Sequence, residues 1–360
     1  MEKFNLDDLI RENIKKLKPY SSARSEYRGE AEVFLDANEN SYGSPVVLTI
    51  PDEKGPGAQL HRYPDPLQWQ LKKELSKIKG VPPQNIFVGN GSDEVIDIAF
   101  RIFCEPGKDN VIVCPPTYGM YRVCADINDV EAKEVLLTDD FQLDVESILA
   151  VINKNTKLLF ICSPNNPTGN NMNRLDIEVL LNNFNGIILI DEAYINFSNQ
   201  KPFLQELTEY ENLIVMHTLS KAWGLAALRL GLGFASEKII DLFNKVKPPY
   251  NINQSSQQLG LHALLNIKEV NGNIKKTVEQ REWASRELRR FKFIKKIFPS
   301  DSNFILVEVD DADKMYQYLL LQRIIVRNRT KEPLCKNCIR ITIGTTEENK
   351  KLIKALENYA

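Results

Sequence analysis

The sequence predicts an α/β fold, in which a large domain with a mostly parallel sheet covered by helices is followed by a smaller α+β domain. Up to about residue 245, short apolar segments alternate with helical stretches, which is typical of a parallel sheet buried on both faces. After VKPPYNIN (246–253) the order changes to two long helical stretches and then to strands mixed with helices. The 360 residues suit about two domains, in agreement with this division.

The first part supplies the elements of the large domain. Strands are expected where apolar residues run together, and helices where apolar residues recur at a period of about 3.6. The expected strands are 31–37, 85–91, 110–114, 133–137, 156–163, 186–194 and 212–220. The expected helices are 67–78, 92–103, 117–127, 144–152 and 176–184.

The second part has fewer strands. Its expected helices are 254–268, 270–292, 311–322 and 346–359, and its expected strands are 302–309, 324–328 and 338–344. The first 30 residues are polar and irregular, as in an arm that lies against another surface. We therefore divide the chain into an arm (1–30), a large domain (31–245) and a small domain (246–360), with a linking segment near 246–270.

Composition and charge exclude several classes of protein. The net charge is −2, whereas a nucleic-acid-binding protein normally carries a basic excess. Apolar runs stay shorter than the ~20 residues of a membrane-spanning helix, and the acidic, polar beginning does not resemble a signal peptide. The six cysteines do not follow the disulfide pattern of a small secreted protein. Reduced thiols and a cytoplasmic location are therefore expected.

Two cysteines, Cys335 and Cys338, form a single CxxC pair. Structural zinc needs four ligands, so one pair is a weak zinc signal. A redox pair would be expected at the start of a helix, whereas this pair precedes a strand. We expect ordinary loop cysteines and no metal site.

The candidate catalytic pair is Asp191 and Lys221. ILID (188–191) places Asp191 at the carboxyl end of a buried strand, where open parallel sheets bind their ligands. HTLSK (217–221) places Ser220 and Lys221 at the end of the next strand. A carboxylate and an amine at adjacent strand ends suit a cofactor with a basic ring nitrogen and an aldehyde. The plainer alternative is a structural salt bridge between the two side chains.

A second candidate feature is the turn GNGSDE (89–94) between a strand and a helix. Backbone N–H groups and the dipole at a helix N-terminus attract an anion such as phosphate. Many helices begin with similar capping residues and bind no ligand. Ser220 and Arg229 could complete a phosphate cradle from a different strand, and this convergence favours the phosphate site.

Together these segments resemble a known family. SPNNPTG (163–169), DEAY (191–194), SKAWGLAALRLG (220–231) and CIRITIG (338–344) resemble the class II aminotransferases of pyridoxal-phosphate fold type I. RYPDP (62–66), PPTYGMY (115–121) and VRNRTKEP (326–333) narrow the resemblance to the histidinol-phosphate aminotransferases, and the match runs from about residue 17 to the C-terminus. The resemblance implies a seven-stranded sheet in the large domain and pyridoxal 5'-phosphate as the cofactor.

For the cofactor ring, the resemblance implies five residues. Lys221 would bind the cofactor aldehyde and later move a proton between substrate and cofactor. Asp191 would pair with the ring nitrogen, Asn166 and Tyr194 would hold the phenolic oxygen, and Tyr118 would stack on the ring. Lys221, Asp191 and Tyr194 are the expected catalytic residues. For Tyr118, the alternative is an aromatic side chain that only packs a helix.

For the cofactor phosphate, the resemblance implies Ser92 and Asp93 at the helix start, together with Ser220 and Arg229. Tyr63 in RYPDP would reach the phosphate bound by the neighbouring subunit. The protein is therefore expected to be a homodimer whose sites each need both chains.

For the substrates, the resemblance implies two arginines. Arg340 would clamp the carboxylate of the amino donor by a bidentate contact and meet the substrate phosphate in the other half-reaction, with Arg327 adding a second charge. A surface position for Arg327 is the alternative, and Arg329 is an equally available neighbour. Tyr20 and Asn38 would close over the substrate. The implied reaction is a ping-pong transfer of an amino group between histidinol phosphate and 2-oxoglutarate in histidine biosynthesis.

Three other functions stay open at this point. An aromatic or broad-specificity aminotransferase would share every cofactor residue. A phosphoamino-acid decarboxylase could use a similar scaffold. A non-enzymatic binding or regulatory protein could share the fold, although Lys221 favours catalysis and fold alone does not decide function.

Overall fold

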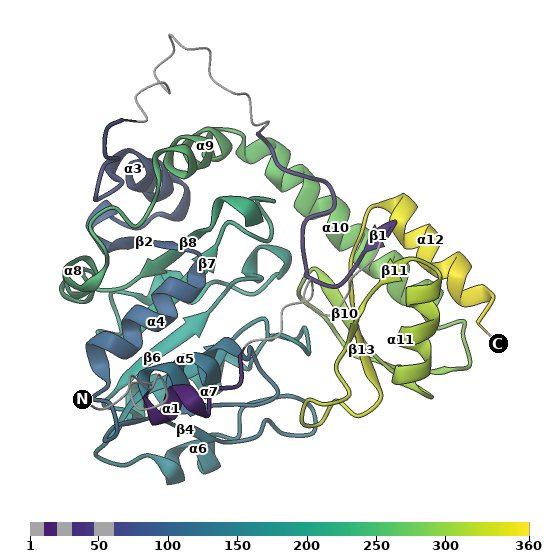
Figure 1. Cartoon of the computed structure of the whole chain (residues 1–360), viewed down its shortest axis with the longest axis horizontal. Coiled ribbons are helices and arrows are strands. Elements are labelled where there is room, and N and C mark those ends of the chain that lie inside the picture. The colour runs from purple at the N-terminus through teal and green to yellow at the C-terminus, as the bar shows by residue number, and fades with distance from the viewer. Residues whose placement is uncertain (1–10, 20–30, 47–60, 360) are drawn as a thin grey trace, which may run out of the picture.

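The protein has two parts, each with its own sheet. The computed structural model describes residues 11–19, 31–46 and 61–359. Figure 1 shows a large sheet with its helices in one part, and a smaller sheet with α11 (Ala312–Leu321) and α12 (Thr346–Glu357) in the other. The long helix α10 (Ile267–Leu288) runs between the two parts. No helix among the described residues is both long and apolar enough to span a membrane.

The large sheet has seven strands and is mostly parallel, as expected. Its order is β2-β8-β7-β6-β5-β3-β4, and only β8 runs antiparallel to its neighbours. The strands are β2 (Ile86–Asn90), β3 (Asn110–Val113), β4 (Glu131–Glu134), β5 (Thr156–Cys162), β6 (Ile187–Asp191), β7 (Leu213–Thr218) and β8 (Leu230–Phe234). The central strands are buried along nearly their whole length, which explains the long apolar runs in their sequences.

Helices cover both faces of this sheet. Alternate side chains of β6 face opposite ways: Leu189 packs with α4 (Ser92–Phe103), α5 (Met120–Asn128) and α8 (Glu237–Val246). Ile188 and Ile190 belong to the core on the other face. The helices of that face are α3 (Trp69–Lys79), α6 (Val145–Val151), α7 (Arg174–Asn183) and α9 (Gln254–Leu265).

The smaller part is built on an antiparallel sheet of order β12-β13-β10-β9. Its strands are β9 (Ile294–Ile297), β10 (Phe304–Val309), β12 (Arg327–Asn328) and β13 (Cys338–Thr342). A third apolar core joins this sheet to α10, α11 and α12.

The expected strand 31–37 differs from the structure in length and position. Only β1 (Val33–Phe34) forms, and it pairs in parallel with β11 (Ile324–Ile325) next to the smaller sheet instead of joining the large one. Val33 and Leu35 are buried in the core of the smaller part, and the β1–β11 pairing supplies the backbone partners. The division into an arm, a large domain and a small domain therefore stays a prediction, with 33–35 packed against the C-terminal part.

Other elements were missed or shifted. β8, α8 and β9 were not predicted, and the expected strand 324–328 is split between β11 and β12, which lie in different sheets. β8 is the sequence LGLGF, whose two glycines weaken a strand signal. Gly231 is needed there because a Cβ atom would overlap the backbone of Gly91 and Ser92. The short helix α1 (Glu12–Lys15) in the expected arm lies against α5, where Asn13 donates to two backbone carbonyls.

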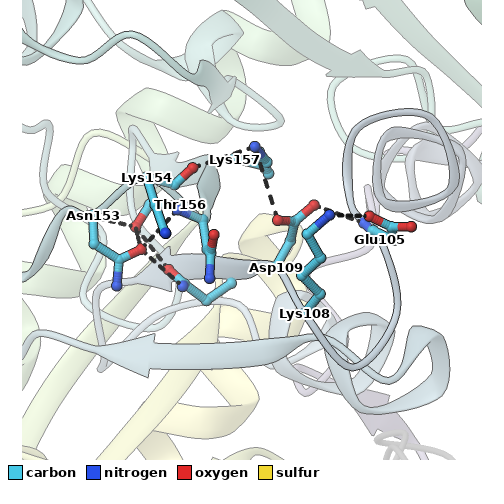
Figure 2. Close-up of polar contacts among 9 residues, drawn as sticks. Glu105, Lys108, Asp109, Asn153, Lys154, Thr156 and Lys157 are labelled. Carbon is cyan, nitrogen blue, oxygen red and sulfur yellow. Dashed lines mark hydrogen bonds and ion pairs between the residues drawn. The ribbon is translucent and has the colours of Figure 1, made fainter.

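Polar side chains tie together the starts of β3 and β5, at the amino edge of the sheet (Figure 2). Thr156 donates to the Asn110 side chain over 2.7 Å. Lys157 lies 3.8 Å from the buried carboxylate of Asp109. These contacts fix one edge of the sheet, and the opposite edge carries the candidate site.

Candidate active site

A cavity of about 820 Å³ opens at the carboxyl edge of the large sheet, between this sheet and the smaller part. Asp191 ends β6, Ser220 and Lys221 follow β7, and Ser92 begins α4 directly after β2. Twelve of the predicted site residues line this cavity: Asn38, Ser92, Asp93, Tyr118, Asn166, Asp191, Tyr194, Ser220, Lys221, Arg229, Arg327 and Arg340. The fold therefore brings together segments spread over 300 residues of sequence.

The amine of Lys221 is held inside the cavity. Its Nζ donates to the carbonyl of Ala37 over 3.0 Å and lies 6.0 Å from the centre of the Tyr194 ring. Burial, and next the positive charge of Arg340, lower the pKa of Lys221 to about 8. About a tenth of the amine is therefore neutral and nucleophilic at pH 7, a far larger fraction than for a lysine of ordinary pKa.

The carboxylate of Asp191 is buried and hydrogen-bonded on both oxygens. Tyr121 donates its hydroxyl to Oδ2 over 2.7 Å, and the backbone N–H of Ala193 donates to Oδ1 over 3.0 Å. Burial raises the pKa of Asp191 to about 6, while both hydrogen bonds and the charge of Lys221 act in the opposite direction. The carboxylate is therefore mostly ionised at pH 7 and suited to pair with a buried cation.

The wall opposite the large sheet is formed by a chain of hydrogen bonds. Asn38 donates to the hydroxyl of Tyr194 and accepts from Thr342, each over 3.0 Å. Arg340 donates to the side chain of Asn166 over 2.6 Å and to the carbonyl of Asp36. Burial raises the pKa of Tyr194, so its hydroxyl stays protonated at neutral pH. This chain fixes residues from both parts of the fold in one geometry.

The start of α4 and the guanidinium of Arg229 form a pocket rich in N–H donors. The Arg229 guanidinium contacts Asp93 over 3.4 Å, and Tyr118 donates to the other oxygen of Asp93 over 3.0 Å. Gly91 has φ +81°, and a Cβ atom there would overlap the Arg229 guanidinium. The first-turn N–H groups of α4, the guanidinium and the hydroxyl of Ser92 make this region fit for a dianionic phosphate.

Two buried arginines face each other across neighbouring strands. Arg327 in β12 is directly opposite Arg340 in β13, so both side chains lie on the same face of the smaller sheet. They are 8% and 6% exposed, which rules out a solvated surface position for Arg327. Arg329 also lines the cavity, and its guanidinium pairs with Glu332 over 3.0 Å.

Of the two remaining predicted residues, the structure describes only Tyr63, which lies outside the cavity. Tyr63 is 80% exposed and does not line the cavity of its own chain; its ring stacks on Tyr250 with centroids 4.4 Å apart. Tyr20 falls outside the described residues. Cys335 and Cys338 are both buried, and within the described ranges no three His, Cys, Asp or Glu side chains gather as a metal site would require.

Sequence reasoning missed the tyrosine that supports Asp191 and a buried polar chain on the other face of the sheet. Tyr121, the second tyrosine of PPTYGMY, is the hydroxyl donor to Asp191, and its presence in that quoted motif was the only available signal. On the other face of the sheet, His217 bonds Glu192 over 2.8 Å and Lys79 over 3.0 Å. Nothing in the separate sequence segments indicated that these three groups meet.

Fold and site together define a class of protein. One cavity holds a buried amine of lowered pKa, a buried carboxylate and an anion pocket whose Gly91 leaves room for a guanidinium. These groups match the aldehyde, ring nitrogen and phosphate of pyridoxal phosphate, and they lie at the carboxyl edge of a fold-type I sheet. The fold and site are those of a pyridoxal-phosphate-dependent enzyme.

Comparison with known proteins specifies the family. The family "Aminotransferase class I and II" matches residues 31–356, so the chain belongs to this family; it is an aminotransferase with pyridoxal 5'-phosphate as its cofactor. The chain is 52% identical to a histidinol-phosphate aminotransferase of Bacteroides thetaiotaomicron over 98% of this chain and 99% of the relative. It is 50% identical to one of Christiangramia forsetii, over 99% of each chain.

Solved structures show the same fold. The histidinol-phosphate aminotransferase of Sinorhizobium meliloti, in complex with pyridoxal-5'-phosphate, has a TM-score of 0.84 at 20% identity and covers 98% of both chains. That of Clostridium acetobutylicum has a TM-score of 0.81 at 24% identity, covering 91% of this chain and 99% of its own. An L-threonine-O-3-phosphate decarboxylase of Porphyromonas gingivalis has a TM-score of 0.72 at 21% identity, with coverages of 91% and 99%.

Proposed function

We propose that this aminotransferase transfers an amino group between histidinol phosphate and 2-oxoglutarate, in histidine biosynthesis. The observation that carries the proposal is the pair of buried arginines, Arg327 and Arg340, which face the same cavity as Lys221 and Asp191. Two guanidinium groups suit a substrate phosphate in one half-reaction and the two carboxylates of glutamate in the other. The identity of about 50% with proteins named histidinol-phosphate aminotransferase supports this assignment.

In this proposal the catalytic step depends on Lys221 and Asp191. Pyridoxal phosphate, when bound, supplies a conjugated ring that takes up the electrons left when the substrate α-carbon loses its proton. The neutral amine of Lys221 removes that proton and later returns one, which its lowered pKa favours. The ionised carboxylate of Asp191 keeps the ring nitrogen protonated. The hydroxyl of Tyr194 donates to the phenolic oxygen, with Asn166 beside it.

Binding and orientation are assigned to the remaining cavity residues. Ser92, Ser220 and Arg229 hold the cofactor phosphate together with the backbone N–H of Asp93, whose carboxylate orients Arg229 and Tyr118. Tyr118 stacks on the ring, and its bond to Asp93 fixes its orientation.

Arg340 clamps the donor carboxylate, and Arg327 adds the second charge toward a phosphate or a distal carboxylate. Asn38 closes the cavity from the side of the smaller part, where it already holds Tyr194. Tyr20 is proposed to close over the substrate as well.

We also propose a homodimer in which Tyr63 reaches the cofactor phosphate of the partner subunit. The 80% exposure of this tyrosine and its position on a loop outside its own cavity support a contact with another chain. A cytoplasmic location is supported by six cysteines that are all free thiols.

A substrate comparison tests the proposed reaction. With 2-oxoglutarate as acceptor, glutamate formation should be faster with histidinol phosphate than with phenylalanine, and carbon dioxide should not be released. Faster turnover of phenylalanine would identify an aromatic aminotransferase, and carbon dioxide release would identify a decarboxylase. Lys221→Ala should lose both turnover and the visible absorbance of the lysine-bound cofactor.

A pair of arginine variants tests the phosphate contact. Arg327→Gln should lower kcat/KM for histidinol phosphate on the order of 10²-fold, the weight of one charge-assisted contact of about 2–3 kcal/mol, and should affect phenylalanine much less. Arg329→Gln is the matched control because that guanidinium is already paired with Glu332. Equal losses in the two variants would contradict the assignment of Arg327.

A further inference from the structure

Lys247 is a buried lysine outside the active-site cavity. It follows the last residue of α8 and is 6% exposed. Its Nζ donates to three backbone carbonyls, those of Pro66 at 2.8 Å, Pro249 at 2.9 Å and Pro248 at 3.2 Å. The three protons of one ammonium group are therefore matched by three acceptors.

These carbonyls belong to two segments that are far apart in the sequence. Pro66 ends the loop that carries Tyr63, and Pro248 and Pro249 precede Tyr250. The rings of Tyr63 and Tyr250 stack with centroids 4.4 Å apart and planes within 9°. Both rings are exposed, by 80% and 44%, so the surrounding core does not hold them in place.

Neutral amides tie the loop of Tyr63 to α9, and the residue after Tyr250 to β2 and α4. Gln257 in α9 donates to the carbonyl of Asp65 over 2.9 Å. Asn251 donates to the carbonyl of Val88 and to the carboxylate of Glu94 in α4, over 3.0 Å and 2.8 Å. The turn held by Lys247 is thus linked to the helix whose first turn forms the anion pocket.

We propose that Lys247 is a positioning residue for Tyr63: its ammonium joins the 62–66 loop to the 248–250 turn, so that the two tyrosine rings stack and the Tyr63 hydroxyl is presented to the partner subunit. This inference rests on the proposed function, in which Tyr63 contacts the cofactor phosphate of the partner. Lysine suits the position because its compact ammonium carries three donors that can converge on three carbonyls. Pre-ordering the exposed loop removes part of the entropy cost of the contact between subunits.

A double-mutant cycle on the holoenzyme tests the proposal. The dissociation constant of pyridoxal phosphate is measured for the wild type, Lys247→Met, Tyr63→Phe and the double variant. When Tyr63 is present, Lys247→Met should raise this dissociation constant about tenfold, which corresponds to the loss of one charge-assisted hydrogen bond. When Tyr63 is replaced by phenylalanine, the same change should raise the constant less than about twofold. Lys245→Met, on the exposed side of the same helix, is the matched control and should change nothing.

The outcomes separate the inference from the function on which it rests. An equal penalty of Lys247→Met in both backgrounds would show a general structural role and overturn the inference. If Tyr63→Phe changes the dissociation constant and Lys247→Met does not, the inference is also wrong, but the proposed function stands. If Tyr63→Phe itself changes nothing, the contact between subunits is wrong and the inference falls with it. If Lys247→Met does not fold, Lys247→Gln, which keeps part of the donors, takes its place and should show the same non-additivity with a smaller rise.

Discussion

Replacing Tyr121 by phenylalanine removes a single hydroxyl group that is buried behind Asp191. That hydroxyl donates to Asp191 over 2.7 Å, and the tyrosine is fully buried, so solvent cannot replace the lost hydrogen bond. A hydrogen bond to a charged group contributes about 1.5–3 kcal/mol. Because 1.36 kcal/mol corresponds to about one pH unit, the pKa of Asp191 should rise by roughly one to two pH units from its value of about 6.

The sign of the effect follows from which form of Asp191 accepts the bond. The hydroxyl stabilises the ionised carboxylate, and without it the protonated form persists to higher pH. Only the ionised form pairs with the ring nitrogen, so cofactor affinity should fall on the acid side of the pKa. The wild type should keep its affinity down to about pH 6, and Tyr121→Phe should begin to lose affinity near pH 7–8.

The assay is the dissociation constant of pyridoxal phosphate as a function of pH, at constant ionic strength. Tyr318→Phe is the matched control, since it removes a hydroxyl that donates to the carbonyl of Ala355 over 2.8 Å in the smaller part. The titration of the cofactor itself contributes equally to both variants and cancels in the comparison. An acid break at the same pH in Tyr121→Phe, Tyr318→Phe and wild type would refute the reasoning.

Three further predictions concern the same cavity. Asp191→Ala should raise the activation free energy of the transfer by about 3–5 kcal/mol, because the protonated ring nitrogen of the cofactor is then buried without its charged partner. Near-normal turnover would contradict this prediction. The rate at which cofactor-free protein binds pyridoxal phosphate should rise with pH, with a midpoint at about pH 8, as Lys221 loses its proton. Arg340→Met should move this midpoint to higher pH, because the positive charge of Arg340 lowers the pKa of Lys221. An unchanged midpoint would exclude this effect of Arg340. Gly91→Ala should weaken cofactor binding, because the added Cβ atom would displace the Arg229 guanidinium. Gly80→Ala is the control: it has a similar φ of +70° but open space at its Cβ, and it should lower stability by only about 1 kcal/mol. Equal cofactor affinities in the two variants would contradict the role of Gly91 in the anion pocket.

The sequence predicted the central strands well because burial on both faces leaves a direct trace in the residues. TKLLFIC and IILID are continuous apolar runs: β5 ends one residue before the expected limit, and β6 covers residues 187–191 of the expected 186–194, which included the exit loop. β8 left no such trace, because its sequence contains two glycines, of which Gly231 is required by the close approach of Gly91 and Ser92. β1 is held by backbone pairing with a strand about 290 residues away, which no local pattern encodes.

The candidate site was predicted to a similar extent and for a similar reason. Lys221 and Asp191 were found because each follows a recognisable strand, and the ends of parallel strands meet at one edge. The partners of these groups were not found: the carbonyl of Ala37 accepts from Lys221, and Tyr121 donates to Asp191, across 184 and 70 residues of sequence. Such contacts depend on tertiary packing, so they cannot be predicted from the sequence spacing or from the residue types.

The segment 36–38 contacts both the catalytic lysine, Lys221, and the proposed carboxylate-binding arginine, Arg340. Ala37 accepts from Lys221 in the large part, and Asp36 accepts from Arg340 in the smaller part. The positive charge of Arg340 is one cause of the lowered pKa of Lys221. A substrate carboxylate that binds Arg340 neutralises this charge, so we expect the pKa of Lys221 to rise once the substrate is in place. The same arginine would then lower the pKa of the amine before a substrate carboxylate binds, and the amine would become a stronger base once that carboxylate is bound.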